Sequence, residues 1–140
     1  MAIRGLVDAN ILIYFIDAEE GEKHTRAKKF MADVDSNSFQ YVIATQTLRE
    51  CAHVWIRKSK LPAERIKEHI LLFEKVFTRP LMDESIDIVN AVSLSHSEKI
   101  PFWDALLAST AKRHGVYTIF TENTKDFERI PGIKAVNPLK

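Results

Sequence analysis

The chain has 140 residues, of which 46% are hydrophobic and 28% charged, with four glycines and five prolines. This composition is typical of one globular domain and excludes the disordered, collagen-like and low-complexity classes. Twenty Lys and Arg against nineteen Asp and Glu leave a net charge of +1. The overall charge therefore indicates neither a nucleic acid nor a membrane as a partner. We expect a single domain over residues 1–140.

The cysteine and histidine content excludes two further classes. The single cysteine, Cys51, excludes an internal disulfide framework, and the five histidines contain no His-x-x-x-His pair that would indicate a zinc site. The longest apolar run, residues 11–16, is too short to span a bilayer. Residues 1–16 have the apolar content of a signal peptide, but Asp8 and Asn10 interrupt them and no small-residue cleavage site follows. We expect a soluble, cytoplasmic protein with no membrane partner.

The first half of the chain contains two predicted strands and three predicted helices. Residues 3–7 form an apolar strand, and the run over 11–16 favours a helix after a short turn. Residues 22–34 form an amphipathic helix, because their apolar positions recur at spacings of three, one and three. Residues 39–44 are a strand candidate, and Thr47 begins a further helix.

The second half of the chain repeats this alternation. Pro62 begins a helix to about Phe73, and residues 75–81 are expected to be extended because Pro80 disfavours helical geometry before it. Two helices follow, one over 85–97 with apolar residues at 86, 89, 92 and 94, and one from Pro101 to a stop at Gly115. Residues 116–121 and 133–136 are predicted strands. Strands separated by helices pair in parallel, which predicts a three-layer α/β/α sandwich with a mostly parallel central sheet.

Acidic residues stand where ligands bind in such a sheet, beyond the carboxyl ends of the strands. Asp8 follows the first strand, Glu50 lies about one helical turn after the second, Asp104 stands at the start of a helix, and Asp126 lies close behind Thr121-Glu122-Asn123. Carboxylates brought within a few ångströms repel one another unless a cation joins them. An oxygen cluster without His or Cys suits Mg²⁺ or Mn²⁺. Such an ion can activate water beside a phosphate.

Each of these residues also has a purely structural interpretation. Asp8 and Asn10 are favoured helix caps, and Glu50 completes a capping box with Thr47. Asp104 complements a helix dipole, although its neighbours three, four and seven positions on are apolar or small, and a carboxylate turned toward them usually has a partner. The remaining residues are ordinary turn formers or a surface acid: Thr121, Asn123 and Asp126. These separate interpretations leave the gathering of acids at one end of the sheet unexplained.

Four motifs occur in a fixed order along nearly the whole chain. They are Leu6-Val-Asp8-Ala-Asn10-Ile-Leu, Thr45-x-Thr47-Leu-x-Glu50, Phe102-Trp-Asp104-Ala-Leu-Leu-Ala-x-Thr-Ala and Thr121-x-Asn123-x-x-Asp126-Phe, with Asn137-Pro138 near the end. Taken together, they resemble the motifs of PIN-domain ribonucleases. More narrowly, the sequence is similar to the VapC-type toxins of bacterial and archaeal toxin–antitoxin pairs.

The resemblance implies a Mg²⁺- or Mn²⁺-dependent endoribonuclease, in which a metal-activated water attacks an RNA phosphodiester in line. The catalytic acids by this analogy are Asp8, Glu50, Asp104 and Asp126, supported by Asn10, Thr121 and Asn123. Asp8 and Asp104 would ligate the metal directly, and Glu50 would orient the waters bound to it. Many members of the family have Asp where Asn123 stands here, so either Asn123 or Asp126 fills the fourth acidic position.

The resemblance also implies protein partners. Such toxins are usually neutralised by an antitoxin whose tail lies along a groove and places a basic side chain at the acids, and they commonly form homodimers. The RNA would be held through its phosphates by nearby cations, for which the candidates are Arg49, Arg57, Lys58, Lys112 and Lys125. Trp55, Phe73 and Trp103 are able to stack bases, although their helical spacing favours a core or a protein interface.

Two other function classes compete with the nuclease. A PIN-like module that binds RNA or protein without cutting is favoured by Asn123 and disfavoured by the presence of Asp8, Glu50 and Asp104. A phosphatase or nucleotide-binding enzyme is disfavoured more strongly, because the four glycines are isolated and form no phosphate-binding loop.

Overall fold

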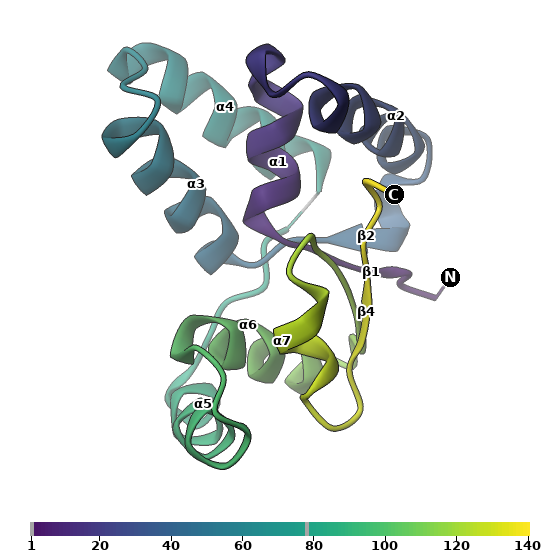
Figure 1. The fold of residues 1–140 in the computed structure, drawn as a ribbon, viewed down its shortest axis with the longest axis vertical. Coiled ribbons are helices and arrows are strands. Elements are labelled where there is room, and N and C mark those ends of the chain that lie inside the picture. Colours follow the sequence, from purple (N-terminus) through teal and green to yellow (C-terminus); the bar gives the residue numbers. More distant parts are fainter. Residues whose placement is uncertain (1, 78) are drawn as a thin grey trace.

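A computed structural model of the chain describes residues 2–77 and 79–140 (Figure 1). Its sheet has four strands in the order β2-β1-β3-β4, and every neighbouring pair is parallel. The strands are β1 Gly5–Val7, β2 Tyr41–Val42, β3 Thr118–Phe120 and β4 Lys134–Val136. All the carboxyl ends therefore lie at one edge of the sheet, as the alternation of elements predicted.

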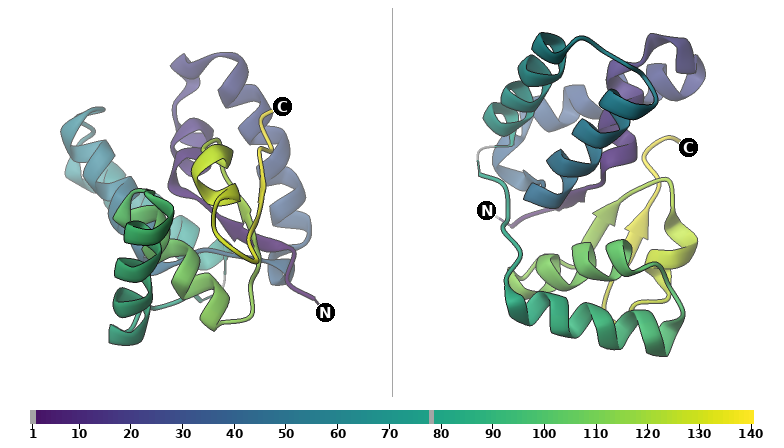
Figure 2. Two further views of the ribbon diagram at one scale, coloured as in Figure 1. Left: turned by 60° about the horizontal axis from the view of Figure 1, so that its bottom comes forward. Right: turned by 90° about the vertical axis from the view of Figure 1, so that its left-hand side faces the viewer.

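Seven α-helices cover the sheet in the described part of the chain. On one side lie α1 Ala9–Ile16, α2 Glu22–Ser36, α3 Thr45–Arg57 and α4 Ala63–Val76, and on the other α5 Ser85–Glu98, α6 Phe102–Arg113 and α7 Thr124–Glu128. Figure 2 shows the strands between these two groups of helices. The predicted three-layer sandwich with a parallel sheet is confirmed. Among the described residues, none of the helices has the length and apolar character that crossing a bilayer requires.

Each face of the sheet has its own hydrophobic core. Val7 packs into the cluster formed with α1 to α4, whereas its neighbour Leu6 packs into the cluster formed with α5 to α7. The same alternation separates Phe120 from Ile119 on β3. Successive strand residues point to opposite faces, so a strand covered on both sides is apolar throughout. This explains why the strand segments show no polar alternation in the sequence.

The boundaries of several elements differ from the predicted ones. Helix α3 begins at Thr45 rather than Thr47, and α4 continues to Val76 rather than ending near Phe73. The segment 75–81 is therefore extended only in part; its residue 78 lies outside the described residues. Leu81 forms an isolated parallel bridge with Ala44, beyond the end of β2. Helix ends are the least predictable boundaries, since the pattern of apolar residues does not mark them.

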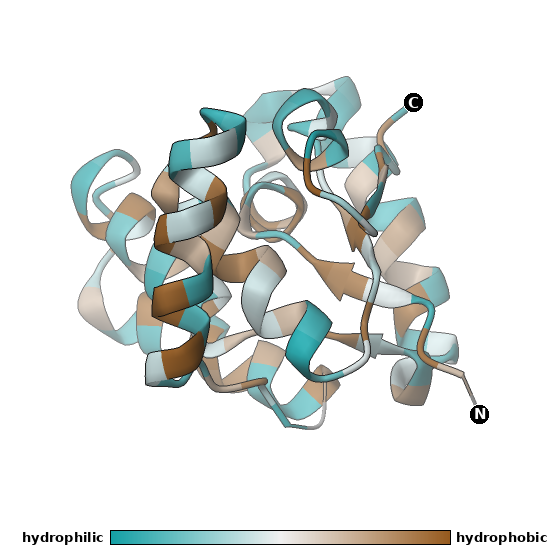
Figure 3. Ribbon diagram, turned by 90° about the horizontal axis from the view of Figure 1, so that it is seen from below, coloured by the Kyte–Doolittle hydropathy of each residue, from teal (hydrophilic) through white to brown (hydrophobic). Residues whose placement is uncertain are grey.

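Three of the four apolar residues that predicted α5 face solvent, and only Leu94 packs against the core. Ile86, Val89 and Val92 are each more than half exposed, while Asp87 and Ala91 are the buried residues of this helix. We call the exposed set the α5 patch: Met82, Ile86, Ile88, Val89 and Val92. Figure 3, which views the molecule from this side, shows hydrophobic segments along α5. Large exposed apolar patches are common at the interaction surfaces of proteins.

A buried ion pair holds α5 against the end of α6. The carboxylate of Asp87, which is 0% exposed, accepts hydrogen bonds from Arg113 Nε at 2.8 and 3.0 Å and from the backbone N–H of Glu84 at 2.8 Å. Burial by itself raises the pKa of Asp87, but the bonds from Arg113 and Glu84 outweigh it and hold this pKa below its ordinary value. Asp87 is thus a charged core residue with its own counter-ion.

We expect Arg113→Met to destabilise the fold by about 3 kcal/mol at pH 7, because it leaves a carboxylate buried without a cation. Urea denaturation measures the loss. The low folded-state pKa of Asp87 contributes stability that is present above the unfolded pKa of about 4 and disappears as pH falls, so the variant and the wild type converge in acid. The exposed pair of Arg49 and Asp83 provides the control, because Arg49→Met should cost less than about 1 kcal/mol. Equal losses in both variants would contradict this account.

Candidate active site

Asp8 lies directly after β1 and has two distinct hydrogen bonds. Its Oδ1 accepts from the backbone N–H of Ala9 at 2.8 Å, which caps α1, and its Oδ2 accepts from Thr121 Oγ1 at 2.8 Å. The residue is 7% exposed. Burial raises the pKa of its carboxyl, and the bonds from Thr121 and Ala9 offset part of that rise. The capping interpretation is therefore correct for Asp8, although it engages only one of the two oxygens, and wrong for Asn10, which lies inside α1.

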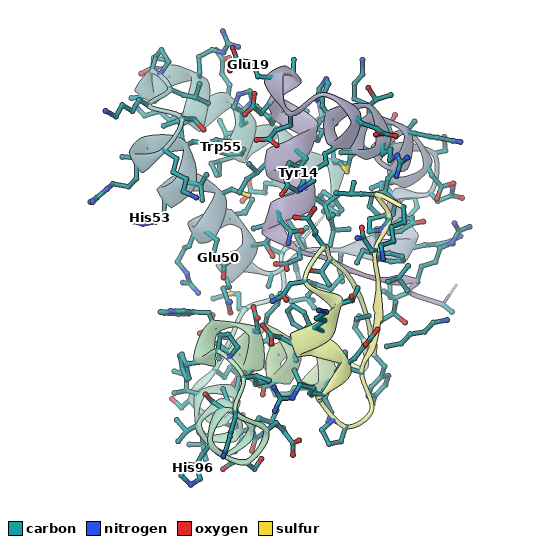
Figure 4. All side chains as sticks on the ribbon, viewed as in Figure 1. Tyr14, Glu19, Glu50, His53, Trp55 and His96 are labelled. Atoms are coloured by element: carbon teal, nitrogen blue, oxygen red, sulfur yellow. The ribbon has the colours of Figure 1, made fainter. Side chains whose placement is uncertain are left out.

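Glu50 projects from the first half of α3 toward α6 (Figure 4). Its Oε1 accepts a hydrogen bond from Gln46 Nε2 at 2.8 Å. The predicted capping box with Thr47 is wrong: because α3 begins two residues earlier, Thr47 Oγ1 instead accepts from the backbone N–H of Ala44 at 3.1 Å. Burial, with the nearby carboxylate of Asp8, raises the pKa of Glu50 despite the bond from Gln46.

Asp104, Asn123 and Asp126 lie together between α6 and the segment after β3. The amide nitrogen of Asn123 donates to Asp104 Oδ2 at 2.8 Å and to Asp126 Oδ2 at 3.0 Å. Both residues considered for the fourth acidic position are therefore in the same cluster. Burial, together with the negative charges of Asp8, Asp126 and Glu50, raises the pKa of Asp104 to about 7.

The segment after β3 is tied to α1 by polar side chains. Thr121, fully buried, donates to Asp8 and accepts from the backbone N–H of Asn123 at 3.0 Å. Asn10 contacts both Thr121 Oγ1 and the backbone N–H of Glu122, each at 3.4 Å. The three residues expected to support the acids thus contact the acids or the loop that holds them.

Two groups of residues that the sequence analysis did not identify complete this arrangement. Gln46, 3% exposed, donates from one amide nitrogen to Glu50 and to the backbone carbonyl of Trp103 at 2.7 Å, which links α3 to α6. Tyr14 on α1 (Figure 4) donates to Glu122 Oε1 at 2.6 Å, and Lys23 pairs with the other oxygen of Glu122 at 2.8 Å. The only signal for Gln46 was its position four residues before Glu50, which places both on one helix face.

The acids of this cluster have no cationic partner in the described part of the chain. Each ion pair there involves other residues, so Asp8, Glu50, Asp104 and Asp126 are held only by neutral donors. The contrast with Asp87, whose burial is balanced by Arg113, is direct. Carboxylates that lack a counter-ion attract a cation.

The donor set fits a hard divalent ion. Every carboxylate atom that could bind a metal is an oxygen. A hard divalent ion keeps several waters and requires only one or two carboxylates. In residues 2–77 and 79–140, no three Asp, Glu, His or Cys side chains form a ready-made ligand set. The fit therefore rests on the chemistry of the oxygens and on their unbalanced charge, and Asp8 is the one buried acid of the four.

The five candidate RNA-binding cations are distributed unevenly around the acids. Arg49 pairs with Asp83 at 2.8 Å, and Lys112 donates to the backbone carbonyl of Pro131 at 2.8 Å. Arg57, Lys58 and Lys125 are exposed. Of these, Lys58 lines a cleft of about 760 Å³ that is walled by α1, α3 and α4 and also lined by Asn10. The structure thus engages two of the five cations and leaves three on the surface.

A parallel sheet covered on both faces, with carboxylates gathered beyond β1 and β3, defines the class of this α/β protein. The model of the PIN domain family matches residues 5–133, and the chain belongs to this family. The family resemblance found in the motifs is thereby confirmed. No curated protein sequence matches the chain.

Several solved structures share the fold over nearly their whole length. A toxin–antitoxin complex from Klebsiella pneumoniae is 24% identical, with a TM-score of 0.64 and coverage of 96% of this chain and 97% of that one. FitAcB from Neisseria gonorrhoeae is 18% identical, with a TM-score of 0.70 and coverage of 99% and 98%. VapBC2 from Rickettsia felis, bound to a DNA fragment from their promoter, is 21% identical, with a TM-score of 0.67 and coverage of 98% of each chain. At these identities, the similarity establishes the fold.

We expect Asp104→Asn to change the pH dependence of stability when divalent ions are removed with a chelator. Because the pKa of Asp104 is about 7 in the folded state, against an unfolded value near 4, the folded protein binds more protons and loses stability as pH rises between these values. The variant lacks this loss. Its free energy of unfolding should equal that of the wild type near pH 4 and exceed it by about 2 kcal/mol at pH 8. This is roughly half of what the full pKa shift would give, because Asp104 is partly exposed to solvent.

Urea denaturation at several pH values measures this difference. Asp35→Asn, at an exposed position of α2, is the matched control and should give a curve parallel to that of the wild type. A parallel curve for Asp104→Asn as well would show that the carboxylates do not interact.

Proposed function

We propose that this protein is a metal-dependent endoribonuclease, the VapC-type toxin of a type II toxin–antitoxin pair. One observation carries the proposal: Asp8, Glu50, Asp104 and Asp126 converge beyond the carboxyl ends of β1 and β3 and, in the described part of the chain, have no cationic partner. The family supports it, as do the similar structures whose names describe toxin–antitoxin complexes. An anionic substrate at such a cluster requires a cation to join the two.

Asp8 and Asp104 are the residues that would hold Mg²⁺ or Mn²⁺. Asp8 is oriented by Thr121 and by the N-terminus of α1, and Asp104 by the amide of Asn123. A divalent ion bound there supplies positive charge against the phosphate and lowers the pKa of water. The carboxylate orientations are fixed before binding, so less ordering is required when the ion enters.

Glu50 would act on the attacking water. Gln46 fixes one carboxylate oxygen, Oε1, and leaves Oε2 to accept a hydrogen bond or a proton from water. Its raised pKa makes Glu50 a stronger base than an ordinary glutamate. Asn123 and Asp126 complete the site from the opposite side. This division of roles needs no side-chain nucleophile, in agreement with in-line attack by water on an RNA phosphodiester.

The cleft between α1, α3 and α4 is our proposed site for the antitoxin. Its floor includes Ile13, Val54 and Trp55, and its rim carries both Lys58 and Glu19, so it offers apolar contact with charge of both signs. Because Asn10 also lines it, the cleft opens toward the acids. A peptide lying there would reach the site with its end.

We further propose that the protein forms a homodimer through the α5 patch. In a two-fold dimer the same patch of both copies would meet, which would cover the apolar side chains of each. The change Val89→Glu places a charge in the patch at a position that is 58% exposed, so the fold should survive while the dimer dissociates. Sedimentation velocity at micromolar concentration measures this shift, with Asp35→Asn as the control. A wild type that sediments as a monomer, or a variant that remains dimeric, would argue against this interface.

The nuclease proposal predicts that the wild type cleaves labelled structured RNA with Mg²⁺ or Mn²⁺ and stops when a chelator is added. Asp104→Asn, purified identically, should lose at least about 100-fold in rate, because it removes the charge of a metal ligand and keeps its shape. Asp35→Asn, at an exposed site, should cleave at the wild-type rate. Gel analysis of the cleavage products at several times gives the rates.

Two outcomes would reject this proposal. Cleavage by Asp104→Asn at the wild-type rate would mean a contaminant or a different site. Absence of cleavage by every protein, together with absence of Mn²⁺ binding to the wild type, would favour the module that binds without cutting.

A further inference from the structure

Trp103 is an exposed aromatic side chain beside the acidic cluster. It directly precedes Asp104 and is 60% exposed, whereas Trp55, the other tryptophan, is 1% exposed in the core. Phe73, the third aromatic residue considered for base stacking, is also fully buried. The expected core role is therefore confirmed for Trp55 and Phe73. The side chain of Trp103 lies outside the hydrophobic core.

The backbone at Trp103 is held close to Glu50. One nitrogen of the buried Gln46 amide donates both to the carbonyl of Trp103 and to Glu50 Oε1, so these two acceptors lie within two hydrogen-bond lengths of each other. The indole also packs edge-on against Phe102, with ring centroids 5.3 Å apart and planes at 71°. The ring is thus exposed but positioned, which lowers the entropy lost when a flat partner binds it.

The charges around the site provide little attraction for an RNA strand, and an aromatic ring can add affinity in another way. Four carboxylates repel a polyanion, the net charge of the chain is only +1, and Arg49 and Lys112 are already engaged by other groups. Stacking of a base on an aromatic ring adds affinity without charge and accepts any base. It also requires an unpaired base, which restricts where a strand can be held.

Trp103 does not extend either surface proposed for protein partners. Arg113, at the far end of α6, pairs with Glu84 and Asp87 at the start of α5, so the first residues of the α5 patch, Met82 and Ile86, adjoin that end. Ten residues of helix separate Trp103 from Arg113, about 15 Å. Trp103 is also not part of the lining of the cleft between α1, α3 and α4. Its position favours a nucleic acid over a protein.

We propose that the indole of Trp103 stacks on an unpaired base of the substrate RNA next to the bond that is cut. This inference rests on the proposed nuclease function and adds how the enzyme selects its substrate. The enzyme then prefers single-stranded segments, since a paired base presents no free face to the ring. Trp103 contacts substrate but takes no part in the chemical step.

Tryptophan fluorescence tests the contact directly, because Trp103 is the exposed one of the two tryptophans. The assay uses Asp104→Asn with Mg²⁺, so that the RNA stays intact, and a hexamer of adenosine as the probe. Stacking should quench the emission, and an abasic hexamer with the same phosphates should not. Adding Trp103→Leu should abolish the quench and weaken binding about tenfold, within the range for one stacked base, while Trp103→Phe restores most of the affinity.

Steady-state kinetics in the wild-type background provide the second readout. Trp103→Leu should raise KM for single-stranded RNA about tenfold and change kcat less than twofold, with an unchanged unfolding midpoint. Unchanged affinity and KM in an enzyme that cleaves RNA would overturn the stacking contact and leave the nuclease standing. Conversion of a dimer to a monomer by Trp103→Leu, with unchanged RNA affinity, would also overturn it. Absence of cleavage by the wild type would instead count against the nuclease itself.

Discussion

Repulsion among buried carboxylates is the constraint on which the rest of this structure depends. The parallel sheet gathers Asp8, Glu50, Asp104 and Asp126 at one edge, and burial strengthens their mutual repulsion. The chain holds them with neutral donors: the hydroxyl of Thr121, the amides of Gln46 and Asn123, and the first N–H of α1. Neutral donors fix the orientation of a carboxylate without cancelling its charge, so the charge remains available to a cation from solution.

Another buried acid of the same chain, Asp87, is neutralised by a cation. Asp87 is more deeply buried than Asp8, yet its pKa lies below the ordinary value because Arg113 neutralises it. The two aspartates differ in their partners, since Asp87 pairs with Arg113 and Asp8 has only neutral donors. An acid with a counter-ion fastens α5 to α6, and an acid without one is costly to the fold unless a ligand supplies the missing charge. This difference separates the structural carboxylate from the proposed functional ones.

Much of this arrangement was predictable from the sequence, and the errors have definite physical causes. The rule that ligands bind beyond the carboxyl ends of parallel strands located Asp8, whereas Asp104 was found from its place at a helix start, facing an apolar stripe. Glu50 was correctly placed near them, but its capping box was wrong because α3 begins two residues before Thr47. The α5 patch was undetectable as a surface, since periodicity shows that a helix has an apolar face and not what covers it. Gln46 was missed because an isolated polar residue gives no sign of burial until α3 and α6 are packed together.

Asn123 shows why a departure from a family pattern must be weighed in three dimensions. An aspartate at this position would add a further negative charge beside Asp104, whose pKa the charge of Asp126 already raises. The amide instead donates to both carboxylates and adds no negative charge. Asn123 therefore removes one negative charge from the cluster and fixes the orientation of the two neighbouring carboxylates. It removes a possible ligand of a second ion but not of the first, because Asp8 and Asp104 both keep their charge and Asp104 gains a fixed orientation from the amide.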